Sequence, residues 1–270
     1  MVMKKRIKII FALCLVLSMI VVCYYYVSMG RAKDAVTVIA DIAYNVNRHS
    51  GYTVFILEVG EYVPYLVLTN DYNGNTLLLR KYVLDELMRY GPPHDGIGRS
   101  YASYYGTSEL GHFLNNEFFY LFSESLQEKI VNSTIEITAR HSLAALADND
   151  LITIGRRVFL LSYEETYGRQ RRRFMEEGER LSYFSHGRRS RIALTSDGEA
   201  MGWWLRTPDT SGIPNEPGAI SFHGVHSTLS IQTLPNGTTL GVRPAFCLPG
   251  DTPIRQGELG GETVFFINEG

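Results

Sequence analysis

Two segments of this chain place an arginine inside its most aromatic and strand-like sequence. The first, GWWLRTPD at residues 202–209, holds the only two tryptophans together with Arg206. The second, GVRPAFCL at residues 241–248, holds Arg243 directly before Pro244. A guanidinium stays charged, and burying it without a partner is costly, so any fold of this chain must give both cations an acceptor. The two arginines therefore either read a ligand or hold the fold together.

Neighbouring side chains of a strand point to opposite faces, so Trp204 and Arg206 share one face while Trp203 and Leu205 share the other. The functional interpretation is an aromatic and guanidinium platform that stacks a sugar or grips a carboxylate. The structural interpretation packs the indoles in the core and turns each guanidinium onto carbonyls or an internal carboxylate, and we favour it. The residues given this structural role are Trp203, Trp204, Arg206, Arg243 and Pro244. The candidate acidic partners are Glu58, Glu117, Glu165 and Asp209.

The N-terminal residues predict a transmembrane helix. Residues 1–8 form a basic tail, and residues 9–27 carry no charge. At 1.5 Å per residue a helix of this length measures about 28 Å, close to the thickness of a bilayer's hydrocarbon. The basic flank predicts a single pass through the cell membrane with the C-terminal domain outside the cytoplasm. A cleaved signal segment, which would leave a secreted protein, is the alternative.

Hydrophobic spacing after this segment predicts a mixed α+β domain. Apolar residues at helical spacing predict a linker helix over residues 34–50 and an amphipathic helix over residues 110–121, with Ser108 as its cap. A hairpin is predicted over residues 66–83 with its turn at Gly74. Strands and helices do not alternate, which disfavours a doubly wound sheet. Further strands are predicted at STIEIT (133–138), RRVFLLSYEE (156–165) and ETVFFIN (262–268).

Five phrases occur in the order and spacing of one bacterial family. They are YLVLTN with NTLLLRKYVLDE, SELGHFLNNEFFYLFSESLQEKI, VFLLSYEETYG, GWWLRTPD and GVRPAFCL. The chain resembles the domain of unknown function 6273 family, which occurs mostly in surface and hypothetical proteins of Gram-positive bacteria and their phages. The resemblance covers residues 51–248 and leaves residues 249–270 as a C-terminal tail. It implies no biochemical role, because the family has no settled one.

The pattern Trp-x-Arg-x-Pro followed by Gly-Val-Arg-Pro is also similar to the end of formylglycine-generating-enzyme and related C-type-lectin-like domains. This similarity implies a C-type-lectin-like α+β domain behind the transmembrane helix, and it carries no activity with it. An oxidase of the formylglycine-generating type needs a pair of reactive cysteines, whereas only Cys247 lies beyond the N-terminal apolar run. Its apolar neighbours predict a buried, inert thiol. We therefore expect no catalytic residue and no cofactor.

A few polar residues are weak ligand-binding candidates. His223 and His226 are three residues apart, but spacing places no third ligand, so no metal site is predicted. Asn215 and Glu216 lie in IPNEPG, whereas sugar-binding C-type lectins hold calcium with Glu-Pro-Asn. The order differs here, and a proline-rich turn accounts for the segment. The ligand-binding candidates are Trp204, Arg206, Asn215, Glu216, His223 and His226.

Charge gives no reason to expect nucleic acid as a partner. The formal net charge is −2, which is close to neutral for 270 residues. Arginines between residues 169 and 191 are interleaved with Glu176, Glu177 and Glu179. This mixture predicts a solvated segment whose charges pair with one another.

We expect a membrane-anchored extracytoplasmic recognition or scaffolding domain that is not an enzyme. Its contacts would be the membrane, through residues 9–27, and a cell-surface glycan or protein. Residues 212–237 are the expected contact surface, because they form glycine- and serine-rich loops between two rigid strands. The alternatives are an enzyme that acts on cell-wall polymer or a protein side chain, and a structural subunit of an envelope complex.

Overall fold

The computed structural model describes residues 36–47, 50–91, 103–143, 150–168, 174–210, 216–228 and 238–268. Contacts divide the chain into two units, Met1–Thr37 and Val38–Gly270, and every helix and strand described here belongs to the second. The basic tail and the predicted transmembrane segment, residues 9–27, lie outside the described residues.

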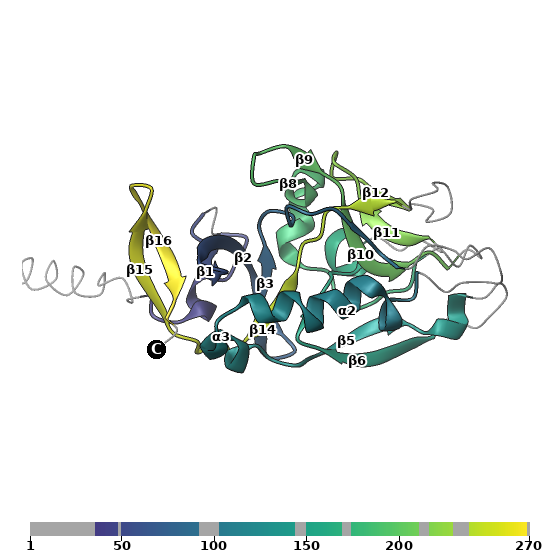
Figure 1. The fold of residues 1–270 in the computed structure, drawn as a ribbon, viewed down its shortest axis with the longest axis horizontal. Helices are drawn as coiled ribbons and strands as arrows, with labels where there is room; N and C mark the ends of the chain where they lie inside the picture. Colours follow the sequence, from purple (N-terminus) through teal and green to yellow (C-terminus); the bar gives the residue numbers. More distant parts are fainter. Residues whose placement is uncertain are drawn as a thin grey trace, which may run out of the picture. The chain divides into compact units, whose positions relative to one another are not determined.

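A seven-stranded sheet organises the second unit (Figure 1). Its strands lie in the order β15-β16-β1-β2-β3-β14-β7. Neighbouring strands run antiparallel, except that β1 and β16 pair parallel. The strands are β1 (Thr53–Glu58), β2 (Glu61–Tyr72), β3 (Asn75–Arg80), β7 (Val158–Phe159), β14 (Ala245–Leu248), β15 (Ile254–Leu259) and β16 (Glu262–Ile267).

The turn between β2 and β3 follows directly from its two residues. Asn73 and Gly74 both have positive φ, 52° and 78°, which a type I′ hairpin turn requires and which this residue pair adopts readily. The pair Tyr72 and Asn75 closes the turn. The predicted hairpin, with Gly74 at its turn, is confirmed.

The centre of the sheet is buried on both faces. Leu77, Leu78 and Leu79 of β3 are fully buried, and so is every residue of β14. Continuous apolar runs of this kind are typical of strands covered on both sides. Burying one leucine side chain contributes about 1.5–3 kcal/mol, so these two strands form the core on which the remaining elements pack.

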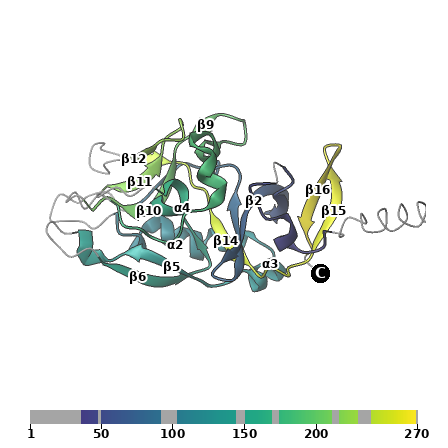
Figure 2. The same ribbon diagram turned by 180° about the vertical axis from the view of Figure 1, so that it is seen from behind.

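Smaller sheets and short helices complete the unit, and α4 lies beside β10 (Figure 2). The smaller sheets pair β10 (Trp203–Pro208) with β11 (Pro217–Ile220) and β12 (His226–Thr228), β4 (Met88–Arg89) with β13 (Thr239–Leu240), β5 (Ser133–Thr138) with β6 (Leu151–Arg156), and β8 (Ala193–Leu194) with β9 (Ala200–Met201). The α-helices are α2 (Glu109–Asn116), α3 (Glu124–Lys129) and α4 (Tyr163–Tyr167). Short 3₁₀ turns are Ile39–Ile42, Tyr105–Thr107, Phe118–Leu121, Arg140–Leu143, Ser182–His186 and Arg188–Arg191.

The described fold is mostly β-sheet, so the prediction of an α+β, C-type-lectin-like domain is wrong. The longest α-helix in the described ranges, α2, has eight residues. Among the described residues no helix combines the length and the apolar character needed to cross a membrane. Strand-like segments dominate because most of the apolar runs pair with one another in sheets.

The predicted linker helix over residues 34–50 is absent from the described residues of that segment, although its apolar residues have helical spacing. In the described part of residues 34–50 only one 3₁₀ turn forms, and Val38 before it makes a β-bridge with Pro253. The Ile39 N–H donates to the Thr252 carbonyl at 2.9 Å, and the Ala40 N–H donates to the Gly250 carbonyl at 3.1 Å. These tertiary hydrogen bonds replace the helical ones.

The predicted amphipathic helix is present but shorter. The Ser108 hydroxyl accepts the Gly111 N–H at 3.0 Å and caps α2, as predicted. The helix ends at Asn116 because Glu117 leaves helical backbone geometry, with φ −127°, and a 3₁₀ turn follows.

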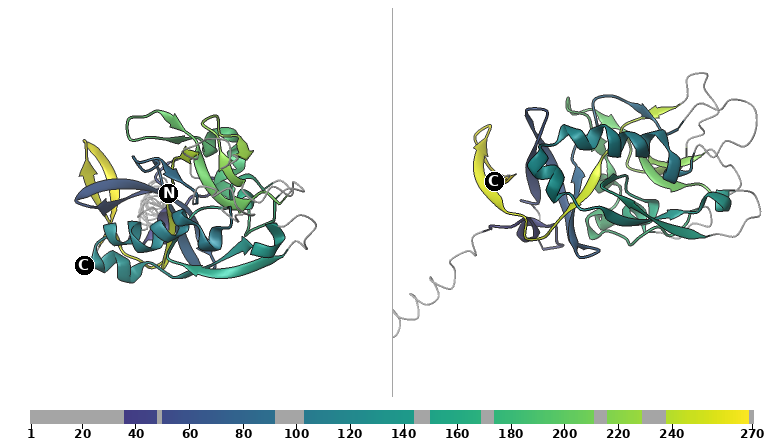
Figure 3. Two further views of the ribbon diagram at one scale, coloured as in Figure 1. Left: turned by 45° about the vertical axis from the view of Figure 1, so that its right-hand side comes forward. Right: turned by 60° about the horizontal axis from the view of Figure 1, so that its bottom comes forward.

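Most of the predicted C-terminal tail belongs to the sheet. The hairpin β15–β16 (yellow in Figure 3) joins β1 through the pairs of Val54 with Phe265 and Phe55 with Phe266. Residues 254–267 are therefore structural strands of the same unit.

Leu78→Ala tests the importance of the sheet's centre. We expect a loss of about 2–5 kcal/mol in the free energy of unfolding, because removal of the fully buried side chain leaves a cavity in the core at the centre of the sheet. Urea denaturation measures this loss. The matched control, Leu259→Ala on the exposed end of β15, should change it by less than about 1 kcal/mol. Equal effects of the two substitutions would contradict this view of the core.

Candidate functional site

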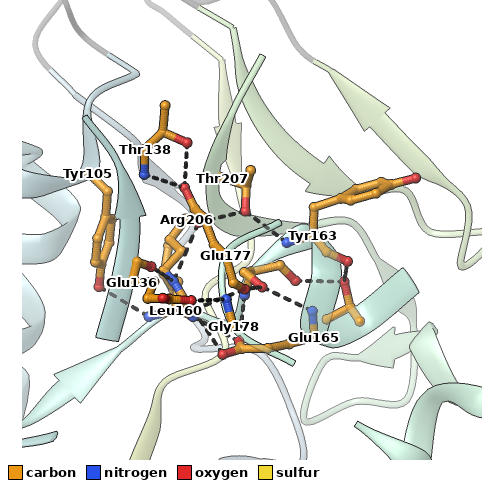
Figure 4. Close-up of polar contacts among 12 residues, drawn as sticks. Tyr105, Glu136, Thr138, Leu160, Tyr163, Glu165, Glu177, Gly178, Arg206 and Thr207 are labelled. Atoms are coloured by element: carbon orange, nitrogen blue, oxygen red, sulfur yellow. Dashed lines mark hydrogen bonds and ion pairs between the residues drawn. The ribbon is translucent and has the colours of Figure 1, made fainter. Parts of the chain in front are cut away.

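Arg206 lies at the centre of a buried ion network (Figure 4). Its Nη1 and Nη2 atoms each donate to one carboxylate oxygen of Glu165 at 2.8 Å, which forms a bidentate pair. Its Nε donates to the Glu136 carbonyl at 3.0 Å, and Nη1 and Nη2 also reach the Leu160 and Glu177 carbonyls at 2.9 and 3.5 Å. A guanidinium has five N–H donors, and all five have an acceptor within the chain.

Glu165 is equally well satisfied. Besides Arg206, its carboxylate accepts the Tyr72 hydroxyl at 2.6 Å and the Ser162 N–H at 2.8 Å, so four donors meet its two oxygens. The Ser162 hydroxyl accepts the Glu165 N–H at 3.0 Å, and this capping box starts α4. The strand predicted over residues 156–165 therefore ends early, with β7, because a helix begins at its last residues.

Glu177 supplies a second buried carboxylate. Its Oε1 accepts the N–H and the hydroxyl of Thr138, both at 2.7 Å, and its Oε2 accepts the Thr207 hydroxyl at 2.7 Å. Its Oε2 also lies 3.5 Å from Arg206 Nε. The pKa of Glu177 is raised above its usual value, because the effect of burial exceeds the opposing effects of the Arg206 cation and these hydrogen bonds. The network therefore holds its second acid with hydroxyl and amide donors.

An open groove of about 700 Å³ lies against this network. We call it the polar groove; its defining side chains are Thr69, Asp71, Thr134, Glu136, Thr153 and Glu179. Asp71, Thr134, Glu136, Thr153 and Glu179 are exposed, and Thr69 is half-buried. The groove is lined by three carboxylates and one cation, Arg180, so it is rich in hydrogen-bond acceptors and carries excess negative charge.

The ion network fixes the backbone of this groove. Tyr72 and Gly178 also line it, and Tyr72 is bonded to Glu165. The Gly178 N–H donates to Glu136 Oε2 at 2.9 Å, and its φ of 77° favours glycine. A Cβ at Gly178 would lie 2.8 Å from Glu165 Oε1, so the close approach of loop and carboxylate also requires glycine.

Arg243 is also buried, but its contacts differ from those of Arg206. Its Nε donates to the Arg80 carbonyl at 3.0 Å and its Nη2 to the Lys81 carbonyl at 3.2 Å. The guanidinium lies 4.9 Å from the centre of the Trp203 ring. Burial lowers the pKa of Arg243 to about 10, so the side chain stays cationic at neutral pH. Within the described ranges no carboxylate pairs with it, and Nη1 has no hydrogen-bond partner.

The tryptophans and Pro244 are interior residues. Trp203 and Trp204 are fully buried, and their indole N–H groups donate to the Arg191 and Met88 carbonyls at 2.9 and 2.8 Å. The Pro244 carbonyl accepts the Arg80 N–H at 2.9 Å. Every residue of β10 is buried, so Trp204 and Arg206 form no exposed platform for a ligand.

The other ligand candidates do not converge. Asn215 lies outside the described residues, Glu216 is half-buried, and His223 is exposed, with its ring 3.9 Å from that of Phe222. His226 is buried, and its ring packs against those of Tyr163 in α4 and Phe174. The described residues contain no group of three His, Cys, Asp or Glu side chains that could hold a metal ion. Of the expected contact surface, residues 212–237, only residues 216–228 are described.

Sequence reasoning identified one of the two acids of the network. Glu165 was a candidate partner and is the partner of Arg206, whereas Glu58 pairs with Arg80 at 3.2 Å. Glu177 was assigned to a solvated charge mixture, and only the tertiary fold shows that its side chain turns inward. Cys247 is buried as expected, and burial raises the pKa of its thiol to about 12.

A model of the family described as Domain of unknown function (DUF6273) matches residues 73–250, about two thirds of the chain. No curated protein and no solved structure matches. The further similarity to C-type-lectin-like and formylglycine-generating-enzyme-like domains finds no support in these comparisons.

Arg206→Ala tests the structural role of the network. We expect a loss of about 3–5 kcal/mol in the free energy of unfolding, because the substitution leaves Glu165 buried without its cation. Thermal and urea denaturation measure the loss. Arg189→Ala, an exposed arginine, is the matched control and should change stability by less than about 0.5 kcal/mol. An Arg206→Ala variant as stable as the control would show that the network does not hold the fold.

Proposed function

This chain belongs to the domain of unknown function 6273 (DUF6273) family, and we propose that it is a non-catalytic recognition domain that binds a hydroxyl-rich ligand of glycan chemistry in the polar groove. The observation that carries the proposal is the groove itself: about 700 Å³, open to solvent, and lined by hydroxyl and carboxylate oxygens. Such oxygens accept hydrogen bonds from the hydroxyl groups of a sugar. Its excess of carboxylates disfavours an anionic ligand.

The rigidity of the groove supports recognition. The Glu136 carbonyl is bonded to Arg206, and the Glu136 side chain is bonded to Gly178. Side chains placed on a fixed backbone lose less conformational freedom when a ligand binds, which strengthens binding. The buried network thus serves the groove as a scaffold.

The distribution of ionisable groups favours binding over catalysis. Arg206 and Glu165 have all their hydrogen-bonding capacity filled by the chain, and Cys247 is buried with a raised pKa. These are poor nucleophiles or general bases, because a reacting group needs access to the substrate. An enzyme acting on wall polymer would instead use the exposed carboxylates of Asp71, Glu136 and Glu179, and it would turn its ligand over.

Oligosaccharide titration tests the proposal. We expect chitohexaose or cellohexaose to bind in isothermal titration calorimetry, and Glu136→Gln and Thr134→Val each to weaken that binding about 5- to 10-fold, because each removes an acceptor from the groove. Thr263→Val, on an exposed position of β16, is the matched control and should bind as the unchanged protein does.

Two results would overturn the proposal. One is the absence of binding to both oligosaccharides by a folded protein. The other is equal affinity of the groove variants and the Thr263→Val control. Release of shortened oligosaccharides during the titration would favour the enzyme alternative.

We also propose that the domain works outside the cytoplasm, on the basis of the basic residues 1–8 and the uncharged residues 9–27, which lie outside the described part. A reporter that is active only outside the cytoplasm, fused after Gly270, should be active. Replacing Lys4, Lys5 and Arg6 by glutamate should reduce this activity, because the basic flank sets the orientation. A cytoplasmic reporter that is active at the same position while the external one is silent would contradict this location.

A further inference from the structure

A second cavity, of about 310 Å³, lies apart from the polar groove and shares no described lining residue with it. We call it the tyrosine pocket; it is defined by Tyr52, Tyr82, Tyr183, Lys81 and Arg243. Its size falls at the lower end of the range for small-molecule sites. Leu66, Ile192 and Leu194 add apolar surface to its wall.

The charge of this pocket is positive. Arg243 is 2% exposed and Lys81 is exposed, and among the described lining residues there is no acidic side chain. The Lys81 ammonium lies 5.4 Å from the centre of the Tyr82 ring, at the same pocket. Two cations and three phenol rings therefore meet without a counter-charge.

Arg243 has an unused hydrogen-bond donor and no acidic partner among the described residues, in contrast to the buried Arg80 and Arg206. Arg206 pairs with Glu165, and Arg80 pairs with Glu58. Besides the Trp203 ring, Arg243 contacts the carbonyls of Arg80 and Lys81 with Nε and Nη2, and its Nη1 has no hydrogen-bond partner among the described residues. A buried cation with neither counter-charge nor full hydrogen bonding is costly to the fold, and a bound anion would reduce that cost by supplying the missing charge.

The tyrosine rings give the pocket a rigid apolar wall. Tyr183 packs edge-on against Tyr44 and Tyr52, with ring centres 5.3 and 5.8 Å apart. Aromatic side chains held by such contacts bind flat or apolar groups with little loss of side-chain freedom. The pocket thus combines a cationic end with an aromatic wall.

We propose that the tyrosine pocket binds a small organic anion, whose carboxylate or phosphate group lies against Arg243 and Lys81 and whose flat or apolar part packs on the tyrosine rings. The oxyanion supplies the counter-charge that Arg243 lacks, and guanidinium groups bind both kinds of oxyanion strongly. This site is independent of the polar groove, whose excess negative charge suits a different ligand.

Calorimetric titration of the full chain with benzoate and with phenyl phosphate tests the proposal, and neutral benzamide serves as the matched ligand control. We expect at least one of the two anions to bind at least about 10-fold more tightly than benzamide, because only the anions offer a charge to the guanidinium. The stronger of the two identifies the oxyanion. Added salt should weaken the binding, since Lys81 lies exposed to solvent.

Two substitutions locate the site. Lys81→Gln should weaken anion binding at least about 3-fold, whereas Lys129→Gln in α3 should leave it unchanged. Arg243→Lys should weaken it at least about 10-fold, because lysine cannot replace the planar fork. If Arg243→Lys does not fold, Lys81→Gln decides. Thr134→Val, in the polar groove, should not change anion binding.

Three results would overturn the proposal. Benzamide could bind as tightly as both anions, neither anion could bind the folded protein, or Lys81→Gln could match Lys129→Gln. Failure of oligosaccharide binding in the polar groove would leave this site standing, since the two sites share no described lining residue and the two tests use different ligands.

Discussion

The bidentate ion pair between Arg206 and Glu165 is the interaction on which the described structure most depends. A buried pair persists only when every donor and acceptor around it is satisfied, because each unmet group costs free energy in a medium that screens charge poorly. That condition explains neighbouring features that would otherwise be unrelated. The capping box at Ser162 gives Glu165 one of its donors, the Tyr72 hydroxyl gives another, and Gly178 leaves room for the carboxylate.

The two arginines that stand out in the sequence have different environments in the fold. Arg206 is enclosed by side-chain and carbonyl oxygens and has no donor to spare. Arg243 lines the tyrosine pocket, is held at two of its nitrogens by carbonyls near the end of β3, and has no hydrogen-bond partner at the third among the described residues. The same residue type, in similar apolar surroundings, thus completes a scaffold in one place and leaves an unused positive charge in the other.

Local signals predicted local structure well. The turn at Gly74, the cap at Ser108 and the strand at residues 133–138 depend on residues that are adjacent in sequence, and all are present. The overall class was wrong because periodicity cannot show pairing between distant segments. Residues 38–40, for example, pair with residues 250–253 in place of forming a helix. Glu177 was missed for the same reason: its partners, Thr138 and Thr207, lie far away in the sequence, and its neighbours are charged.

The parallel pairing of β1 with β16 has a consequence for biosynthesis. Val54 and Phe265 are register partners, so the edge of β1 waits for a strand made about 200 residues later. Until β16 emerges from the ribosome, that edge has unpaired amide and carbonyl groups, which can form hydrogen bonds with strands of other nascent chains. Pairing with β16 therefore covers the edge of β1. A translation product that stops before β16 is expected to aggregate through this open edge.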